Sequence, residues 1–402
     1  MPGTARDGRG VMTPVAMRMQ RRVSRPVRLA AASLLLAGVT GGVTQFTASA
    51  AGAAARAPAA FSISGGLSGV VATSETNAWA VGSTGSNSSA KTLILHWNGT
   101  AWKRVASPSP AGGAGLSSVA ATSPANAWAI GSTGNDKTLI LHWNGAAWKQ
   151  VPSPDLAAYS VLSAMAATSP ANVWAVGSTG STKTLILHWN GTAWKQVPSP
   201  SPAPAYLTSV AATSASNAWA IGYTGTGTLV LHWNGKTWQR VSSPAPGLVT
   251  NPVSSTGGTL IGVGTVSAAT AWAVGTTGDC GCGNGDSLIL RWNGTAWKQV
   301  PSPTPAGGRK AGAALRSVAA TSTNNAWAVG VSGCGCMPSS YWPFILRWNG
   351  TAWKQVPSAI QSVSTSLSAV AATSASNAWA VGTTGTGQTL IEHWNGTVWK
   401  LS

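Results

Sequence analysis

The sequence repeats one unit of roughly 45 to 55 residues seven times, and this repeat limits what the chain can fold into. Each copy carries three tryptophans at equivalent positions, and Trp342 is the one of the 22 tryptophans that lies outside the pattern. A repeat of this length predicts a stacked or closed array in which each unit packs against its neighbours. The copies begin at Leu67, Leu116, Leu162, Leu207, Leu260, Leu315 and Leu367.

Each copy divides into four short apolar runs separated by turn residues, as the second copy, 116–154, illustrates. Its runs are rich in β-branched and aromatic residues at strand length and have no helical period, which predicts four antiparallel strands. Asn144-Gly145 predicts a tight type I′ hairpin between the last two strands, because both residues accept a positive φ. The four runs are SVAATS (118–123), AWAIGS (127–132), TLILHW (138–143) and AWKQVP (147–152).

Seven four-stranded units without helices predict an all-β fold, a seven-bladed β-propeller over residues 61–402. A run such as TLILHW is apolar on both faces, so each blade needs a neighbour on either side, and a closed ring supplies both. The first run of each blade is expected innermost, where small side chains fit, and the WKQV strand outermost. Because the last copy ends at Ser402, soon after Trp399, we expect 61–64 to pair near this shortened edge and close the ring.

Residues 1–50 have the features of a secretory signal peptide. Five arginines between positions 18 and 28 precede an apolar run, 29–43, and Ala48-Ser49-Ala50 matches a small-residue cleavage site. Residues 51–60 are interpreted as a linker. No later stretch reaches the ~18 continuous apolar residues that a membrane span needs. We therefore expect a secreted protein without a membrane span.

The positive charge is spread around the array. Without residues 1–50 the chain keeps 18 basic and six acidic side chains. Nucleic-acid binding requires positive charge gathered on one face, so this distribution argues against a nucleic-acid partner. A solvated rim is the simplest interpretation, and attraction to an anionic cell-surface polymer is the alternative. One lysine recurs in six of the copies: Lys103, Lys149, Lys195, Lys298, Lys354 and Lys400.

The phrase L-x-x-V…AWAVG…L-x-H-W-N-G-x-x-W resembles the repeats of secreted bacterial propellers of the kelch/galactose-oxidase and BNR (Asp-box) groups, and of photosystem assembly-factor propellers. In the latter, WAVG is followed by an Asp-box hairpin. Here the hairpin reads NGTAW (98–102), with asparagine in place of aspartate. The resemblance covers 67–402 and implies the propeller fold. Such propellers include hydrolases, lyases, lectins and scaffolds, so it implies no single activity.

The recurring aromatic and histidine positions are expected to be structural. A tryptophan present in every blade meets a packing need of every blade, and stacking on sugar rings is the alternative. Arg291 and Arg347 occupy the histidine position in two blades. Because arginine cannot replace neutral imidazole as a metal ligand, we expect hydrogen-bond donors between blades. The histidines are His96, His142, His188, His232 and His393.

Acidic residues are too few to indicate an enzyme. A glycosidase needs two carboxylates at a defined separation, and only Asp279 and Asp286 lie close in the sequence. With Asn284 they could hold calcium through oxygen ligands, but their spacing matches no standard calcium loop. We expect no cofactor and no catalysis.

Two Cys-Gly-Cys motifs lie between the second and third strands of adjacent blades: Cys280/Cys282 and Cys334/Cys336. In an exported protein they indicate disulfides. Three connectivities are possible, of which bonds bridging the two turns are favoured. A Cys₄ zinc site is the alternative.

Departures from the repeat gather in the turns between second and third strands and in the crossings between blades, which propeller topology places on one face. These loops differ most in blades four to six, and rigid folds often carry specificity in such loops. We therefore predict a non-catalytic, monomeric recognition protein that binds a glycan or cell-surface polymer there. A protein-docking scaffold and a polysaccharide-acting enzyme are the alternatives. The predicted contact residues are Trp342, Tyr341, Asp279, Asp286, Arg309 and Lys310.

Overall fold

The computed structural model describes residues 61–134, 137–154, 156, 159–180, 182–246, 257–278, 285–305, 312–334 and 341–402. The chain divides into two units, Met1–Arg56 and Ala57–Ser402. All described residues belong to the second unit, so the predicted signal peptide (1–50) and linker (51–60) lie outside them.

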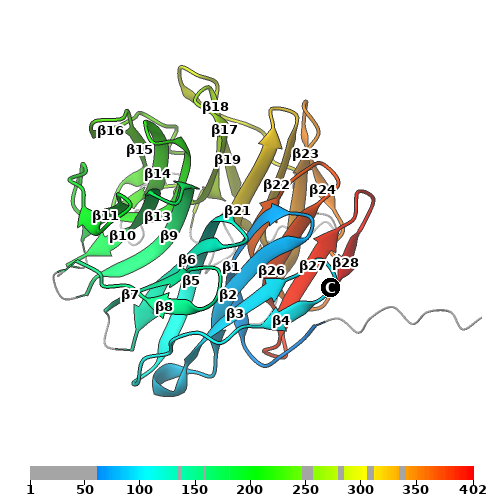
Figure 1. The fold of residues 1–402 in the computed structure, drawn as a ribbon. Coiled ribbons are helices and arrows are strands. Elements are labelled where there is room, and N and C mark those ends of the chain that lie inside the picture. The colour runs from blue at the N-terminus through cyan, green and yellow to red at the C-terminus, as the bar shows by residue number, and fades with distance from the viewer. Residues whose placement is uncertain are drawn as a thin grey trace, which may run out of the picture. The chain divides into compact units, whose positions relative to one another are not determined.

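The second unit is a seven-bladed β-propeller, which confirms the predicted fold (Figure 1). Each blade is a four-stranded antiparallel sheet whose strands follow one another in sequence order. We call them the inner, second, third and outer strands. The helical structure among the described residues is the single 3₁₀ turn η1 (Asn87–Ser89).

The strand bounds are as follows. Blade 1 contains β1 (Gly66–Ser74), β2 (Asn77–Thr84), β3 (Lys91–Trp97) and β4 (Trp102–Arg104), and blade 2 contains β5 (Ala114–Ser123), β6 (Asn126–Thr133), β7 (Thr138–Trp143) and β8 (Trp148–Gln150). Blade 3 contains β9 (Val161–Ser169), β10 (Asn172–Thr179), β11 (Lys183–Trp189) and β12 (Trp194–Gln196), and blade 4 contains β13 (Ala205–Ser214), β14 (Asn217–Thr224), β15 (Gly227–Trp233) and β16 (Trp238–Arg240). Blade 5 contains β17 (Thr259–Ser267), β18 (Thr270–Thr276), β19 (Ser287–Trp292) and β20 (Trp297–Gln299), and blade 6 contains β21 (Gly312–Ser322), β22 (Asn325–Cys334), β23 (Trp342–Trp348) and β24 (Trp353–Val356). Blade 7 contains β25 (Ser366–Ala372), β26 (Ala378–Thr383), β27 (Thr389–Trp394) and β28 (Trp399–Leu401).

The SVAATS-type strands line the centre of the ring, as predicted. Each inner strand contacts the inner strand of the next blade, from β1 through β5, β9, β13, β17 and β21 to β25. The contact between β25 and β1 completes the circle. Each outer strand makes its main contacts with the third strand of its own blade, so it lies at the rim of the ring.

The segment 61–65 closes the ring at blade 7, which confirms the predicted pairing. Ile63 donates its N–H to the Thr389 hydroxyl (3.1 Å), and its carbonyl accepts the N–H of Thr389 (2.9 Å). The Phe61 N–H bonds to the Ser402 carbonyl (3.0 Å), so the start of the described chain adjoins the C-terminus (Figure 1). In blade 1 the equivalent threonine, Thr92, bonds instead to Ser107 of the following crossing. The N-terminal segment thus takes the place at blade 7 that a crossing takes at blade 1.

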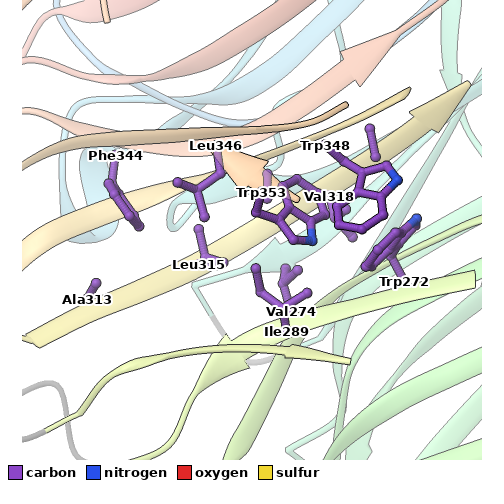
Figure 2. Close-up of a cluster of buried hydrophobic side chains, with 12 residues drawn as sticks. Trp272, Val274, Ile289, Ala313, Leu315, Val318, Phe344, Leu346, Trp348 and Trp353 are labelled. Carbon is purple, nitrogen blue, oxygen red and sulfur yellow. The ribbon is translucent and has the colours of Figure 1, made fainter. Parts of the chain in front are cut away.

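Seven hydrophobic clusters, one at each junction between blades, form the core. At the junction of blades 5 and 6, Val274 and Ile289 pack against Leu315 and Leu346 (Figure 2). Both faces of the second and third strands are buried, as the run TLILHW requires. Burial of this kind, at roughly 25 cal/mol per Å² of apolar surface, is the dominant stabilising contribution.

The glycine of the AWAVG phrase is required by close backbone contact. A Cβ added to Gly222 would lie 1.9 Å from the carbonyl oxygen of Tyr206 on the inner strand. The equivalent glycine of each blade meets the same obstacle. The inner strand carries a β-bulge beside it, for example between Leu207 and Ser209. This repeated position therefore reflects the path of the backbone.

The Asn-Gly hairpins do not adopt the predicted type I′ turn. In the turn of blade 2 only Gly145 takes a positive φ, of 93°. Asn144 accepts hydrogen bonds from the N–H groups of Ala146 and Ala147, both at 3.0 Å, through its side-chain oxygen. The prediction was wrong because the asparagine serves as a side-chain acceptor at the start of the turn, where a positive φ is not needed.

Candidate functional site

The two ends of the blades form two faces with different chemistry. We call the end with the inner-to-second turns and the Asn-Gly hairpins the turn face. The other end, with the second-to-third turns and the blade crossings, is the loop face. Hydrogen bonds join these last two elements, as between Ala114 N–H and Ala90 carbonyl (3.0 Å) and between Ala205 N–H and Thr182 carbonyl (3.0 Å). The predicted sharing of one face by these loops is confirmed.

Tryptophans form a repeated packing unit near the turn face. Trp79 of the second strand lies 5.1 Å from Trp143 and 5.3 Å from Trp148 of the next blade, measured between ring centroids. The same triad recurs at all seven junctions, including that of Trp379 with Trp97 and Trp102. Second-strand tryptophans are 0–1% exposed and outer-strand ones 4–5%. The second-strand and outer-strand tryptophans are therefore packing residues that cannot stack on a ligand, whereas the third-strand tryptophan is half-buried in blades 1 to 5.

The histidines bond within their own blade, which corrects the prediction of donors between blades. The Nε2 atom of His96 lies 2.8 Å from Oδ1 of Asn77, and its ring stacks on Trp79 at 4.1 Å. Burial lowers the pKa of all five histidines, so the neutral form is favoured. The reason is register, because each histidine lies opposite the second-strand tryptophan of the same sheet. In blade 6 Arg347 does reach the next blade and donates to the Ala375 carbonyl (3.2 Å).

The loop face holds the aromatic residues that break the repeat. Trp342 begins β23 opposite Ser332 and is half-buried. Tyr341, also half-buried, packs against Ala314 and Val331. Tyr159, at the start of blade 3, is 64% exposed. The remaining two of the four tyrosines in the chain, at positions 206 and 223, are also at this face.

A stacked tyrosine pair on blade 4 was missed by the sequence reasoning. Tyr206 and Tyr223 face each other on β13 and β14, with ring centroids 5.0 Å apart and planes inclined by 26°. Burial and the proximity of Tyr206 raise the pKa of the Tyr223 phenol. The sequence did contain a signal for this pair, because Tyr223 occupies a repeat position where blades 1 to 3 have serine.

A polar cavity of about 340 Å³ lies at the rim of blade 4. Hydroxyl groups of Thr224, Thr226 and Ser242 line it together with Arg240. A cavity of about 420 Å³ occupies the equivalent place in blade 1, where Arg104 matches Arg240. The cavity is thus a product of the repeat that becomes basic where arginine replaces the usual glutamine.

The described carboxylates lie in three separate places. Asp286 is exposed on the loop face, and its backbone bonds to Thr277 (2.9 and 3.0 Å). The Glu75 carbonyl, on the turn face, accepts the Trp97 indole N–H. Glu392 is buried within blade 7, where its carboxyl bonds to Ser358 (2.5 Å) and to the Ala359 N–H (3.1 Å). Within the described part of the chain, no two acidic side chains are placed to act on one bond.

Several predicted residues lie outside the described residues: Asp279, Asn284, Arg309, Lys310, Cys280, Cys282 and Cys336. The backbone of Cys334 ends β22, and its side chain is not described. The calcium site, the disulfides and the basic contacts therefore stay predictions. Among residues with described positions, no three metal-ligating side chains gather.

No model of a known protein family matches the sequence, and no curated protein matches it. Solved structures do match the fold. One is YCF48 bound to D1 peptide, at 15% identity and TM-score 0.52, covering 82% of this chain and 95% of that one. The BP39L lectin from Burkholderia pseudomallei matches at 13% identity and TM-score 0.54, covering 84% and 97%. The GH74 xyloglucanase from Xanthomonas campestris matches at 13% identity and TM-score 0.55, covering 85% of this chain and 56% of that one.

These structural matches show a shared propeller fold, and identities of 13–15% leave the activity open. The described residues also include no helix with the length and apolar character of a membrane span.

Proposed function

We propose that this chain is a secreted, non-catalytic recognition propeller that binds a glycan or another cell-surface polymer through the loop face of blades 4 to 6. The observation that carries the proposal is the distribution of aromatic residues. All four tyrosines and the one tryptophan outside the repeat lie on the loop face. Exposed aromatic faces suit sugar rings, which present apolar C–H groups between their hydroxyls.

Blade 4 supplies the better-formed part of this surface. Its stacked pair, Tyr206 and Tyr223, holds two rings in fixed orientation, so little conformational entropy is lost on binding. Hydroxyl groups and Arg240 line the nearby rim cavity of about 340 Å³ and could bond to sugar hydroxyls or to an acidic polymer. Tyr341, Trp342 and the exposed Asp286 provide contacts on blades 5 and 6.

The similar structures are compatible with a binding function, but they do not indicate whether the ligand is a glycan or a protein. The similar structures include a lectin and a protein solved with a bound peptide. A protein-docking scaffold is therefore the second candidate. A polysaccharide-acting enzyme is the third, since the described carboxylates lie apart and a glycosidase needs two of them close together.

A glycan array with matched aromatic variants tests the proposal. Binding should fall about tenfold or more for Trp342→Ala and for the double variant Tyr206→Ala/Tyr223→Ala, because aromatic anchors carry much of a binding energy. Tyr159→Ala is the matched control: it removes an exposed aromatic from blade 3 of the same face. It should leave binding unchanged.

Three results would overturn the proposal. Binding that survives both blade 4 and blade 6 variants would move the site elsewhere. A protein that binds no glycan but retains one stable partner in pull-downs from its native secretome would be a docking scaffold. Turnover of a polysaccharide that is lost in Asp286→Ala would indicate the enzyme.

A further inference from the structure

The seven inner strands enclose a central channel with a cavity of about 220 Å³. Each strand contributes three consecutive residues to its wall, and the first of the three is the bulged residue that the register skips. A β-bulge re-aims a side chain, so each blade presents one additional residue at the channel wall. Two of these residues, Ser117 and Thr208, donate their hydroxyl hydrogens to backbone carbonyls of their own and the next blade, at 2.8–3.2 Å. The bulged residues are Ser68, Ser117, Ser163, Thr208, Ile261, Arg316 and Ser368.

Arg316 is the exception in this set. It is the only charged residue in the wall of the cavity, and no carboxylate lines it. Burial lowers the pKa of Arg316, an effect that the nearby Tyr341 phenol partly offsets. A guanidinium stays charged in proteins, so burial of this side chain costs free energy that a bound anion would offset.

Hydroxyl groups around the channel have hydrogens to donate. The Oγ atoms of Ser118, Ser209 and Ser317 each accept an N–H from the inner strand of the next blade, at 3.2 Å. An oxygen that accepts in this way still carries a hydrogen that it can donate. The wall therefore offers one fixed positive charge and several donors, without an opposing negative charge.

We propose that the central channel is a binding site for a small oxyanion group, a carboxylate, sulfate or phosphate, held by Arg316 and by serine hydroxyls of the channel wall. A planar guanidinium binds such groups through two parallel hydrogen bonds. The cavity is smaller than the roughly 300–1,000 Å³ of pockets for drug-sized ligands, so it fits a small group or the end of a chain.

The site lies toward the loop face. Arg316 is four residues from Gly312, the loop-face end of β21, and six from Ser322 at the turn-face end. Its electrostatic neighbour, Tyr341, belongs to the loop face. The site adjoins the aromatic surface of blades 4 to 6 at Tyr341, but its binding of a small anion does not depend on glycan binding there.

Thermal unfolding with simple anions tests the proposal. Sodium acetate, sulfate and phosphate are each added at tens of millimolar and compared with sodium chloride of equal ionic strength. At least one should raise the Tm by roughly 2 °C beyond chloride, because an anion that binds only the folded state stabilises it. The anion with the largest effect identifies the group that the channel selects.

Residues at equivalent positions of other blades provide substitutions that the fold should accept. Arg316→Ser introduces the residue that four other blades carry at this bulge, so folding should be kept. It should abolish the anion-dependent shift and leave the Tm in chloride equal or higher. Lys149→Gln removes one positive charge at an exposed outer-strand position where blade 4 carries glutamine, and should retain the full shift.

The proposal fails if no anion exceeds chloride, or if Arg316→Ser responds to anions as the wild type does. A lower Tm of Arg316→Ser in chloride alone, with no anion effect in the wild type, would make Arg316 a structural residue. Glycan-array binding through Trp342 can succeed or fail independently of either result.

Discussion

The two faces of the propeller are built from the same seven repeats, yet one is nearly uniform and the other is not. On the turn face every junction holds the same tryptophan triad and every hairpin the same Asn-Gly turn. On the loop face the lengths and residues of the turns change from blade to blade, and a tyrosine pair occurs in blade 4 alone. The difference separates residues that hold the ring together from residues that are free to take another role.

Packing explains the uniform half. A second-strand tryptophan contacts two tryptophans of the next blade, so a change in one blade leaves a gap against its neighbour. The loop-face residues have fewer such partners. Trp342 and Tyr341 are only half-buried, and Tyr159 is largely exposed. The loop face can therefore vary without cost to the core, which is how a rigid fold acquires a specific surface.

The same substitution made on both faces gives the largest expected contrast. Trp128→Ala should lower the free energy of unfolding by about 3–5 kcal/mol, because the side chain is fully buried at a junction. Trp342→Ala should cost about 1 kcal/mol or less. Urea unfolding of the two variants checks this. Equal losses would remove the distinction between the faces.

Ring closure shows that a loop-face segment can also stabilise the fold. A chain that begins at Gly66 lacks the segment that bonds to Thr389, Gly387 and Ser402. We expect it to lose about 2–4 kcal/mol, since several backbone hydrogen bonds and the packing of Phe61 and Ile63 are removed. A chain that begins at Phe61 is the control and should unfold like the longer protein. Differential scanning calorimetry of both chains checks this. An unchanged Tm for the chain that begins at Gly66 would exclude this closure.

The hairpin asparagines of the turn face should contribute to stability through their side-chain hydrogen bonds. Asn144→Ala should destabilise the protein by about 1 kcal/mol, because two backbone N–H groups lose their acceptor. Asn144→Asp keeps the acceptor and should be nearly neutral. Chemical unfolding curves distinguish the two. An alanine variant as stable as the aspartate variant would show that the side-chain bonds contribute nothing.

The histidines predict a small acid sensitivity that belongs to the turn face. Their folded pKa lies below the ordinary 6.5, so the unfolded chain takes up protons more readily as the pH falls below about 6.5. Stability should therefore decrease from there toward the folded pKa. His142→Arg reproduces the arginine–asparagine pair of blade 6 and should reduce the decrease. The Tm measured from neutral to mildly acidic pH checks this, with Tyr159→Ala as a control that should follow the wild type.

The sequence predicted the repeated features well because seven copies report the same constraint. The blade order, the inner strands and the buried tryptophans followed from periodicity alone. The errors concern side-chain partners. Asn144 was assigned by backbone preference, although its oxygen bonds to the turn, and His96 was placed between blades, although its asparagine is in the same sheet.

Single departures from the repeat were harder to interpret. Arg316 follows the first leucine of its copy, where five blades have serine or threonine and one has isoleucine, so it was visible in an alignment of the repeats. Its place in the channel depends on the β-bulge, which the pattern of apolar residues does not reveal. Tyr206 and Tyr223 were likewise separated in sequence, and only the register of β13 and β14 brings them together.

Hydrogen–deuterium exchange tests the central claim most directly, that one face holds the ring together and the other recognises a ligand. The protein would be measured alone and with the best-binding glycan of the array. The account predicts slower exchange in the peptides around Tyr206, Tyr223 and Trp342, and no change around the Asn-Gly hairpins. Protection centred on those hairpins, with unaltered exchange on the loop face, would contradict it.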